Sequence, residues 1–271
     1  MAAARCEAAG HLRLWASSIA GQYFVLRSMG DARWIALMAR QHEVAVAIGD
    51  AHALAWVTNT QGVAAMYRGD AIAADGHFAR ACAAYEAIPD FRFLAGSLAR
   101  RAYCRALAGE MDHALRLIGQ CEDLIRRYHI RGIAASAPVL YVAEAYLCAA
   151  QSHPDAGERR AALRRAGPAC ARALRHGRRT GDESAAEALR LAGTFAWLSA
   201  RPERAQRNWT QGIAVADRKG ANHALAKLHH EFALRTGDAT HAQAAKEWFD
   251  KTGSAPVESP ISRGSVQSQR A

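Results

Sequence analysis

A glycine followed directly by an acidic residue recurs along this chain and limits its fold more than any other feature of the sequence. The six pairs are Gly30-Asp31, Gly49-Asp50, Gly69-Asp70, Gly109-Glu110, Gly181-Asp182 and Gly237-Asp238. Glycine adopts the left-handed conformation that ends a helix at little steric cost, and an acidic side chain caps the free N–H groups that begin the next helix. Each pair therefore predicts the end of one helix and the start of another.

The spacing of these pairs sets the length of the repeating unit. The first three are about 20 residues apart and the fourth follows about 40 residues later. One helix of roughly 17 residues plus a turn fills the shorter interval, so a pair of helices repeats about every 40 residues. Further along the chain, Pro138, Pro154, Gly167-Pro168, Pro202 and Gly220 supply the remaining breaks.

Composition favours helices throughout. The chain has 271 residues, 51% of them hydrophobic but only 7% aromatic, so alanine provides much of the apolar surface. We expect an all-α fold, a right-handed solenoid of about six helix pairs over residues 1–251, followed by a disordered tail rich in Gly, Ser and Pro over residues 252–271. The expected pairs are 10–29 with 31–47, 51–68 with 75–88, 92–108 with 111–128, 134–151 with 157–177, 183–200 with 202–219, and 221–236 with 238–250.

One helix pair carries the pattern of a known repeat. Leu189, Ala192-Gly193, Ala200 at the turn, Ala205, Trp209 and Gly212 place small residues where two helices touch and a large ring beside them. This pattern resembles the tetratricopeptide repeat. Gly62 and Gly69, followed by Phe78, Ala81 and Tyr85, fit the same pattern if a loop is inserted around Ala71 to Gly76.

Three further features narrow the set of families that the chain resembles. They are the unit of about 40 residues, the Ile-Gly-Asp and Thr-Gly-Asp joints, and the ending at residues 248–253. Together they are similar to the helical repeat region of bacterial signalling regulators, namely LuxR-type ATP-dependent transcriptional activators and ATPase-linked cyclases and kinases. Those regulators carry the nucleotide-binding string G-x-x-x-x-G-K-[ST], and this chain has no such string. The resemblance thus implies the sensor or interaction part of such a system.

Motifs for catalysis and cofactors are missing from the sequence. No G-x-S-x-G string occurs, and the carboxylates stand at turns and exposed positions where capping explains them. His223, His229, His230 and His241 cluster, but no acidic or cysteine ligand has H-E-x-x-H spacing to them. We expect no enzyme activity, no metal and no cofactor.

The cysteines and apolar stretches indicate where the chain resides. Cys6, Cys82, Cys104, Cys121, Cys148 and Cys170 are scattered singly, as core residues in a reducing compartment are. No signal peptide is evident, and the apolar stretch 133–150 contains Pro138 and Glu144, which favours a buried helix over a membrane span. We expect a cytoplasmic protein without a membrane partner.

The chain is basic, with 35 Lys and Arg against 25 Asp and Glu, and its arginines gather in one region. This basic patch contains Arg159, Arg160, Arg164, Arg165, Arg172, Arg175, Arg178 and Arg179. Such a patch binds phosphates or an acidic protein. No aromatic residues for base stacking are interleaved with it, so a solvated outer helix is the favoured interpretation and nucleic-acid or anion binding is the alternative.

A binding surface follows from the geometry of stacked helix pairs. The first helix of each pair lines the concave side, so its outward positions meet a ligand. These positions are Asn59, Tyr67, Tyr103, Glu144, Arg190, Thr194, Trp197, Lys227 and Glu231. The sequence therefore predicts a non-catalytic adaptor or sensor that holds a peptide or protein partner in its concave groove. The resemblance to bacterial regulators implies a role in bacterial signalling or transcription regulation.

Overall fold

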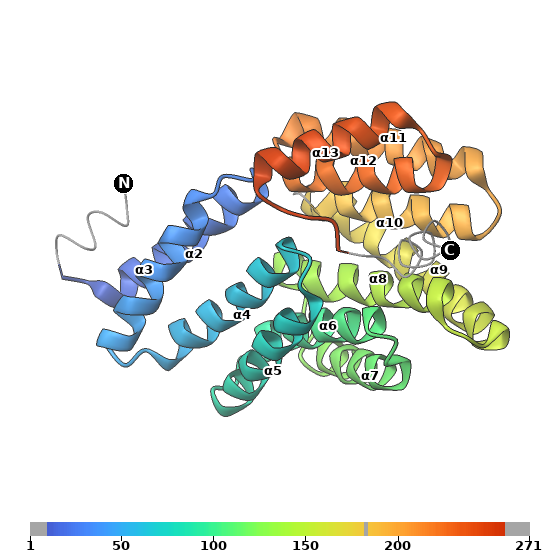
Figure 1. The fold of residues 1–271 in the computed structure, drawn as a ribbon. Helices are drawn as coiled ribbons and strands as arrows, with labels where there is room; N and C mark the ends of the chain where they lie inside the picture. Colours follow the sequence, from blue (N-terminus) through green and yellow to red (C-terminus); the bar gives the residue numbers. More distant parts are fainter. Residues whose placement is uncertain (1–9, 182–183, 258–271) are drawn as a thin grey trace, which may run out of the picture.

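The computed structural model describes residues 10–181 and 184–257, which form an array of antiparallel helix pairs (Figure 1). The helices are α2 (Leu12–Ser28), α3 (Arg33–Ala47), α4 (Ala51–Tyr67), α5 (Ala71–Ala87), α6 (Phe91–Leu107), α7 (Met111–Arg127), α8 (Ser136–Ser152), α9 (Ala156–Thr180), α10 (Ser184–Leu198), α11 (Pro202–Lys219), α12 (Asn222–Thr236) and α13 (Ala239–Thr252), with a short 3-10 helix, η1 (Gly132–Ala135), before α8. These six pairs confirm the predicted all-α solenoid.

The glycine and acidic joints do what the sequence predicts. All six of the predicted stop glycines have a positive φ, from 62° at Gly181 to 81° at Gly109. The Asp50 carboxylate accepts from the backbone N–H groups of His52 and Ala53, and so begins α4. The Glu110 carboxylate binds Arg105 instead of capping α7. The N-cap of α3 is Ala32, which has no capping side chain, and Asp182 lies outside the described residues.

One detail of the expected helix boundaries is wrong. The loop expected around Ala71 to Gly76 does not exist, because Asp70 caps the next helix at once and the alanine-rich segment continues as α5 from Ala71. The joint before α6 has no glycine at all. There Asp90 follows a proline and accepts from the N–H groups of Arg92 and Phe93, so the cap alone is enough to begin the helix.

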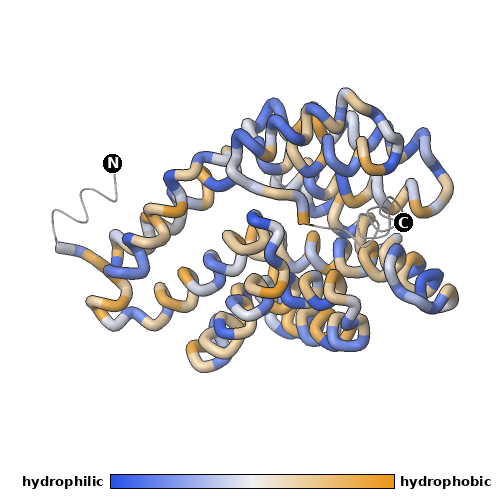
Figure 2. Tube along the Cα trace, in the orientation of Figure 1, coloured by the Kyte–Doolittle hydropathy of each residue, from blue (hydrophilic) through white to orange (hydrophobic). Residues whose placement is uncertain are grey.

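Small residues bring the two helices of a pair close together, and aromatic rings fill the space beside them. Trp209 on α11 is fully buried and lies against Gly193 on α10, where a Cβ atom would stand 2.2 Å from Nε1 of the ring. The ring also donates to the Arg190 carbonyl oxygen at 3.2 Å. The second pair repeats this arrangement, because a Cβ atom on Gly62 would stand 2.6 Å from Cε1 of the Phe78 ring. Along the helices, hydrophobic residues alternate with hydrophilic ones (Figure 2).

Replacing Gly193 by alanine is expected to lower the free energy of unfolding by about 1–2 kcal/mol, because the overpacking cost against Trp209 exceeds the gain in helix propensity. Gly119 on α7 is the matched control, since an added Cβ there meets no atom within 4 Å. Gly119→Ala is expected to raise the stability by about 0.5–1 kcal/mol. Urea unfolding of both variants measures the difference, and a Gly193→Ala protein as stable as Gly119→Ala would refute the close packing.

The array curves until its last pair meets its first (Figure 1). The side chain of Asn222, at the start of α12, donates from Nδ2 to the carbonyl oxygen of Met29, which ends α2, at 2.7 Å. Thr252, at the end of α13, lies against Gly30, where a Cβ atom would stand 2.2 Å from the Thr252 methyl carbon. The first helices of the later pairs therefore face one another across an enclosed inner face.

Residues 253–257, called the C-terminal strap below, run from α13 across this inner face. The Ala255 N–H donates to the carbonyl oxygen of Tyr67 at 2.7 Å, and the Ser254 hydroxyl lies 3.3 Å from His223 Nδ1. Val257 packs against the core shared by the second to fourth pairs. The strap belongs to the segment expected to be a disordered tail, whose remaining residues, 258–271, lie outside the described part of the chain.

One helical stretch of the described residues, Gly132–Ser152, is long and apolar enough to cross a membrane, and 56% of its apolar window is buried inside the protein. It packs on α6, α9 and α10 as a core helix of the array. The described cysteines, all but Cys6, are buried. Burial raises the pKa of Cys82, Cys104, Cys121 and Cys170 to about 12, so these thiols stay protonated.

Candidate binding cavity on the inner face

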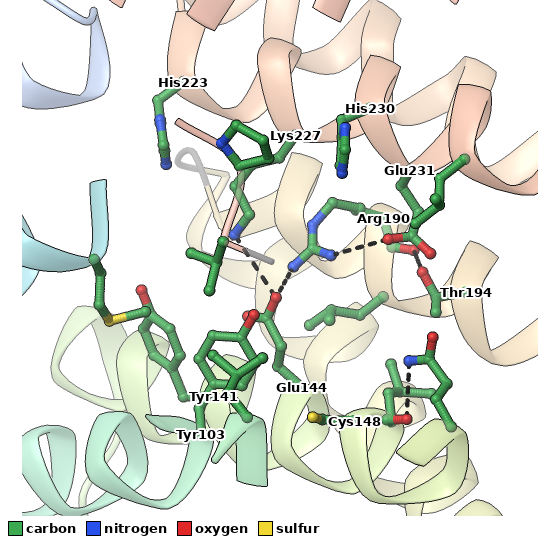
Figure 3. Close-up of a pocket in the computed structure, with 18 of the residues that line it drawn as sticks. Tyr103, Tyr141, Glu144, Cys148, Arg190, Thr194, His223, Lys227, His230 and Glu231 are labelled. Atoms are coloured by element: carbon green, nitrogen blue, oxygen red, sulfur yellow. Dashed lines mark hydrogen bonds and ion pairs between the residues drawn. The ribbon is translucent and has the colours of Figure 1, made fainter. Parts of the chain in front are cut away.

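The inner face contains a cavity that is lined by the first helices of five pairs and by the strap (Figure 3). Its volume is about 90 Å³. Residues from α4, α6, α8, α10 and α12 form its walls, and Phe249 of α13 closes one side. The wall combines tyrosine rings, aliphatic side chains and a group of charged residues.

Seven of the nine residues predicted for the concave surface line this one cavity: Tyr67, Tyr103, Glu144, Arg190, Thr194, Lys227 and Glu231. The other two lie elsewhere. Asn59 accepts a hydrogen bond from the Ser97 hydroxyl at 3.1 Å and joins α4 to α6. Trp197 packs in the core near Trp209, with 6.0 Å between ring centroids. Whether the seven bind a partner stays a prediction.

Arg190 on α10 is the centre of a buried ion-pair network in the cavity (Figure 3). Its side chain is 7% exposed, and its Nη2 pairs with Glu144 of α8. Its Nε donates to Glu187 Oε2 at 2.9 Å, and its Nη1 lies 3.9 Å from Glu231 Oε2. One guanidinium thus links three carboxylates from three successive helix pairs.

Two further cations complete the network. Lys227 Nζ donates to Glu187 Oε2 at 3.1 Å and lies 3.9 Å from Glu144 Oε1. Arg235 Nε donates to Glu231 Oε1 at 2.9 Å, and its Nη2 donates to the Gln151 side chain. Three cationic side chains therefore face three carboxylates, and the network carries no net charge.

The pairing outweighs the effect of burial on the pKa values. Burial by itself raises the pKa of Glu187, but Lys227 and Arg190 more than offset it and hold that pKa at about 2. At Glu231, burial again acts to raise the pKa, but Arg235 and Arg190 lower it below its ordinary value. Burial acts to lower the pKa of Arg190, but the three carboxylates raise it well above its ordinary value. Glu187, Glu231 and Arg190 are therefore charged at neutral pH.

His223 closes the cavity where the two ends of the array meet. Its ring stacks on that of Tyr67, with 3.7 Å between centroids and 16° between planes. Burial and the nearby Lys227 lower the pKa of His223 to about 3, so the imidazole is neutral at physiological pH. A neutral, stacked imidazole packs against the strap hydroxyl of Ser254 without adding charge to the cavity.

Tyrosine rings form the opposite wall. Tyr103 of α6 and Tyr141 of α8 have ring centroids 5.9 Å apart, and the Arg100 guanidinium lies over the Tyr141 ring at 5.3 Å. Burial, followed by the Glu144 carboxylate, raises the pKa of Tyr103 well above its ordinary value. These rings offer broad apolar faces with a polar edge, the kind of surface on which extended polypeptide packs.

Several cavity residues were not predicted from the sequence. Tyr141 and Cys148 flank Glu144 on the same face of α8, and Arg235 stands four residues after Glu231 on α12, so helical spacing alone would have found them. Glu187, the partner of Lys227, lies three residues before Arg190 and fits the same rule. The strap has no such signal, because nothing in its composition relates it to α4.

The basic patch lies on α9, which is the second helix of its pair and packs on α8 and α10 from the outside (Figure 1). Arg172 pairs with Glu122 of α7 at 2.8 Å, and Arg159 donates to the carbonyl oxygens of His153 and Pro154. The other six arginines of the patch are exposed. Anion or nucleic-acid binding by them stays the alternative prediction, and a steep loss of binding with rising salt is its signature.

The described residues hold no group of three or more His, Cys, Asp or Glu side chains placed to bind a metal ion. Within the clustered histidines, His229 and His241 face each other, with 2.8 Å between their Nδ1 atoms, while His223 and His230 line the cavity.

The comparisons with known proteins concern the fold. No protein family matches the sequence, and no curated protein does. The structure is similar to that of a Rap protein solved in complex with competence and sporulation factor, with a TM-score of 0.57 and 12% sequence identity. The match covers 88% of this chain and 76% of the Rap chain. This likeness supports the helical-repeat fold, while the resemblance to LuxR-type regulators stays a prediction.

Proposed function

We propose that this protein is a non-catalytic adaptor or sensor that holds an extended segment of a protein or peptide partner in its inner cavity. One observation carries the proposal: the first helices of five pairs converge on a single cavity and bring seven of the nine predicted contact residues to it. Because the helices are fixed by their packing, a bound segment would meet a preorganised surface.

The charges of the cavity favour a polypeptide segment over a polyanion. The three cations of the network are matched by three carboxylates, so the network itself offers no excess positive charge to attract phosphates. Tyrosine faces and aliphatic side chains instead complement apolar side chains, and the buried polar groups complement the N–H and C=O groups of an extended backbone.

The fold likeness supports the same class of function. The similar Rap protein was solved with a factor bound to it. We infer that this chain serves a related purpose, in bacterial signalling or transcription regulation and in the cytoplasm. Fold alone does not specify a partner, so the inference depends on the cavity described above.

A photocrosslinking amino acid placed at Leu234, which lines the cavity, is expected to capture a partner segment from a native cell extract. The control carries the same amino acid at Ile72 on α5, an aliphatic side chain that is 85% exposed on the outer surface. Mass spectrometry of the crosslinked products identifies the partner and the residues joined. Capture at position 72 alone, or equal products from both positions, would contradict a partner site on the inner face.

A further inference from the structure

The strap occupies the cavity as an extended segment of polypeptide. Its Ala255 N–H donates to the carbonyl oxygen of Tyr67, at the end of α4, where helix carbonyls have no partner within the helix. Its Ser254 hydroxyl faces His223, and Ala255, Pro256 and Val257 form part of the cavity wall. Backbone and side chains of the strap thus make the kinds of contact expected from a partner segment.

The space left beside the strap is too small for a second segment. Cavities that hold organic ligands measure about 300–1,000 Å³, whereas about 90 Å³ remains here. A partner segment therefore fits only after the strap has left. The strap is joined covalently to α13, so even weak contacts keep it in place through its high effective concentration.

We propose that the strap is an internal ligand of the cavity, and that the partner is an uncharged, extended segment of the same kind, with a small residue, a proline and a branched apolar residue in succession. This inference rests on the proposed function. Proline suits the second position because it favours extended backbone and has no N–H to satisfy. A charged segment would upset the neutral network around Arg190, so the partner competes with the strap by shape and backbone pairing.

A full-length variant with the strap released tests the competition. Val257→Asp places a charge in the apolar contact of the strap, and Val46→Asp makes the same change at an exposed position on α3. The probe is a fluorescein-labelled peptide of the uncharged residues 252–257, and its binding is followed by fluorescence anisotropy. The Val257→Asp protein is expected to bind the probe at least tenfold more tightly than the wild type, and the Val46→Asp protein is expected to bind it as the wild type does.

A locked variant tests the opposite direction. The Cβ position of Gly69 lies 3.8 Å from Ala255 Cβ, a separation that suits a disulfide between cysteines at these two positions. Because Gly69 has a φ of +78°, a side chain there strains the turn, but it does so in both the oxidised and the reduced forms that the experiment compares. In the Gly69→Cys/Ala255→Cys protein, oxidation is expected to abolish probe binding, and reduction is expected to restore it to the level of the same protein before oxidation. Because one protein provides both states, this result stands even if Val257→Asp fails to fold, which helical circular dichroism reveals.

The outcomes separate this inference from the proposed function. Probe binding that is the same in the wild type, in Val257→Asp and in the oxidised lock would overturn the internal-ligand role. Partner capture at Leu234 by the oxidised lock would overturn it too, while leaving the inner-face site intact. Conversely, release and locking that control the probe as expected, with no partner captured at Leu234, would support the strap and count against the proposed function.

Discussion

Replacing Arg190 by methionine is expected to lower the free energy of unfolding by about 3–5 kcal/mol. The guanidinium pairs with Glu144, Glu187 and Glu231, and its removal leaves three carboxylates in a buried site with only Lys227 and Arg235 to offset them. A methionine fills a similar volume, so the effect reports the lost charge more than a lost contact. Urea unfolding at neutral pH measures it.

Arg175→Met is the matched control, because Arg175 is exposed on α9. Its stability is expected to stay within about 0.5 kcal/mol of the wild type. Arg190→Lys is expected to fall between the two, since an ammonium group retains the charge but not the forked geometry that reaches several carboxylates. A loss below about 1 kcal/mol for Arg190→Met would show that the carboxylates are hydrated or rearrange, contrary to the buried network.

Acidification from pH 7 to pH 5 is expected to cost about 2 kcal/mol of stability through His223 alone. Its pKa is about 3 in the folded protein, against 6.5 for an unperturbed histidine, so the unfolded state binds the proton first. A histidine with a lowered folded pKa contributes stability that is present above pH 6.5 and is lost as the pH falls towards 3. The positive charges of Lys227, Arg27 and Arg190 oppose the protonation of His223. The Glu187 carboxylate favours protonation, but its effect is smaller than that of burial or of Lys227.

His223→Phe is expected to remove this part of the pH dependence, because phenylalanine keeps an aromatic ring beside Tyr67 but binds no proton. Some dependence will remain, since burial also lowers the pKa values of His229 and His230. His42→Phe is the control, as His42 is exposed on α3. The measurement is the difference in unfolding free energy between pH 7 and pH 5, compared among the wild type, His223→Phe and His42→Phe. An unchanged difference in His223→Phe would mean that His223 is open to solvent.

Most of the fold can be predicted from the sequence because residues next to each helix end determine where that helix stops. A left-handed glycine and a capping carboxylate act within a few residues, so Gly49-Asp50 can be recognised without knowing what packs around it. The start of α6 was also placed within a residue, although its cap, Asp90, has no glycine before it. The loop expected after Asp70 was wrong because helix propensity overrode the alignment with a known repeat.

The candidate site could be predicted in part for the same reason. First-helix positions that share a face converge once the pairs stack, which is why Tyr103, Glu144 and Lys227 meet in one cavity. The pairing of Arg190 with carboxylates from three helix pairs was not predictable, because the distances depend on the curvature of the array. The position of the strap depends on the same curvature, since it bridges α13 and α4.

The contact between Asn222 and Met29 joins residues 193 positions apart in the sequence. In an open array, adding or deleting a unit merely lengthens or shortens the molecule. Here α12 contacts α2 only if the rotations between successive units add up to one particular angle. A single inserted or deleted unit would change that angle and separate α12 from α2. Ring closure consequently fixes the number of units between α2 and α12, and gene duplication within this part of the array is expected to be tolerated far less than in a linear solenoid.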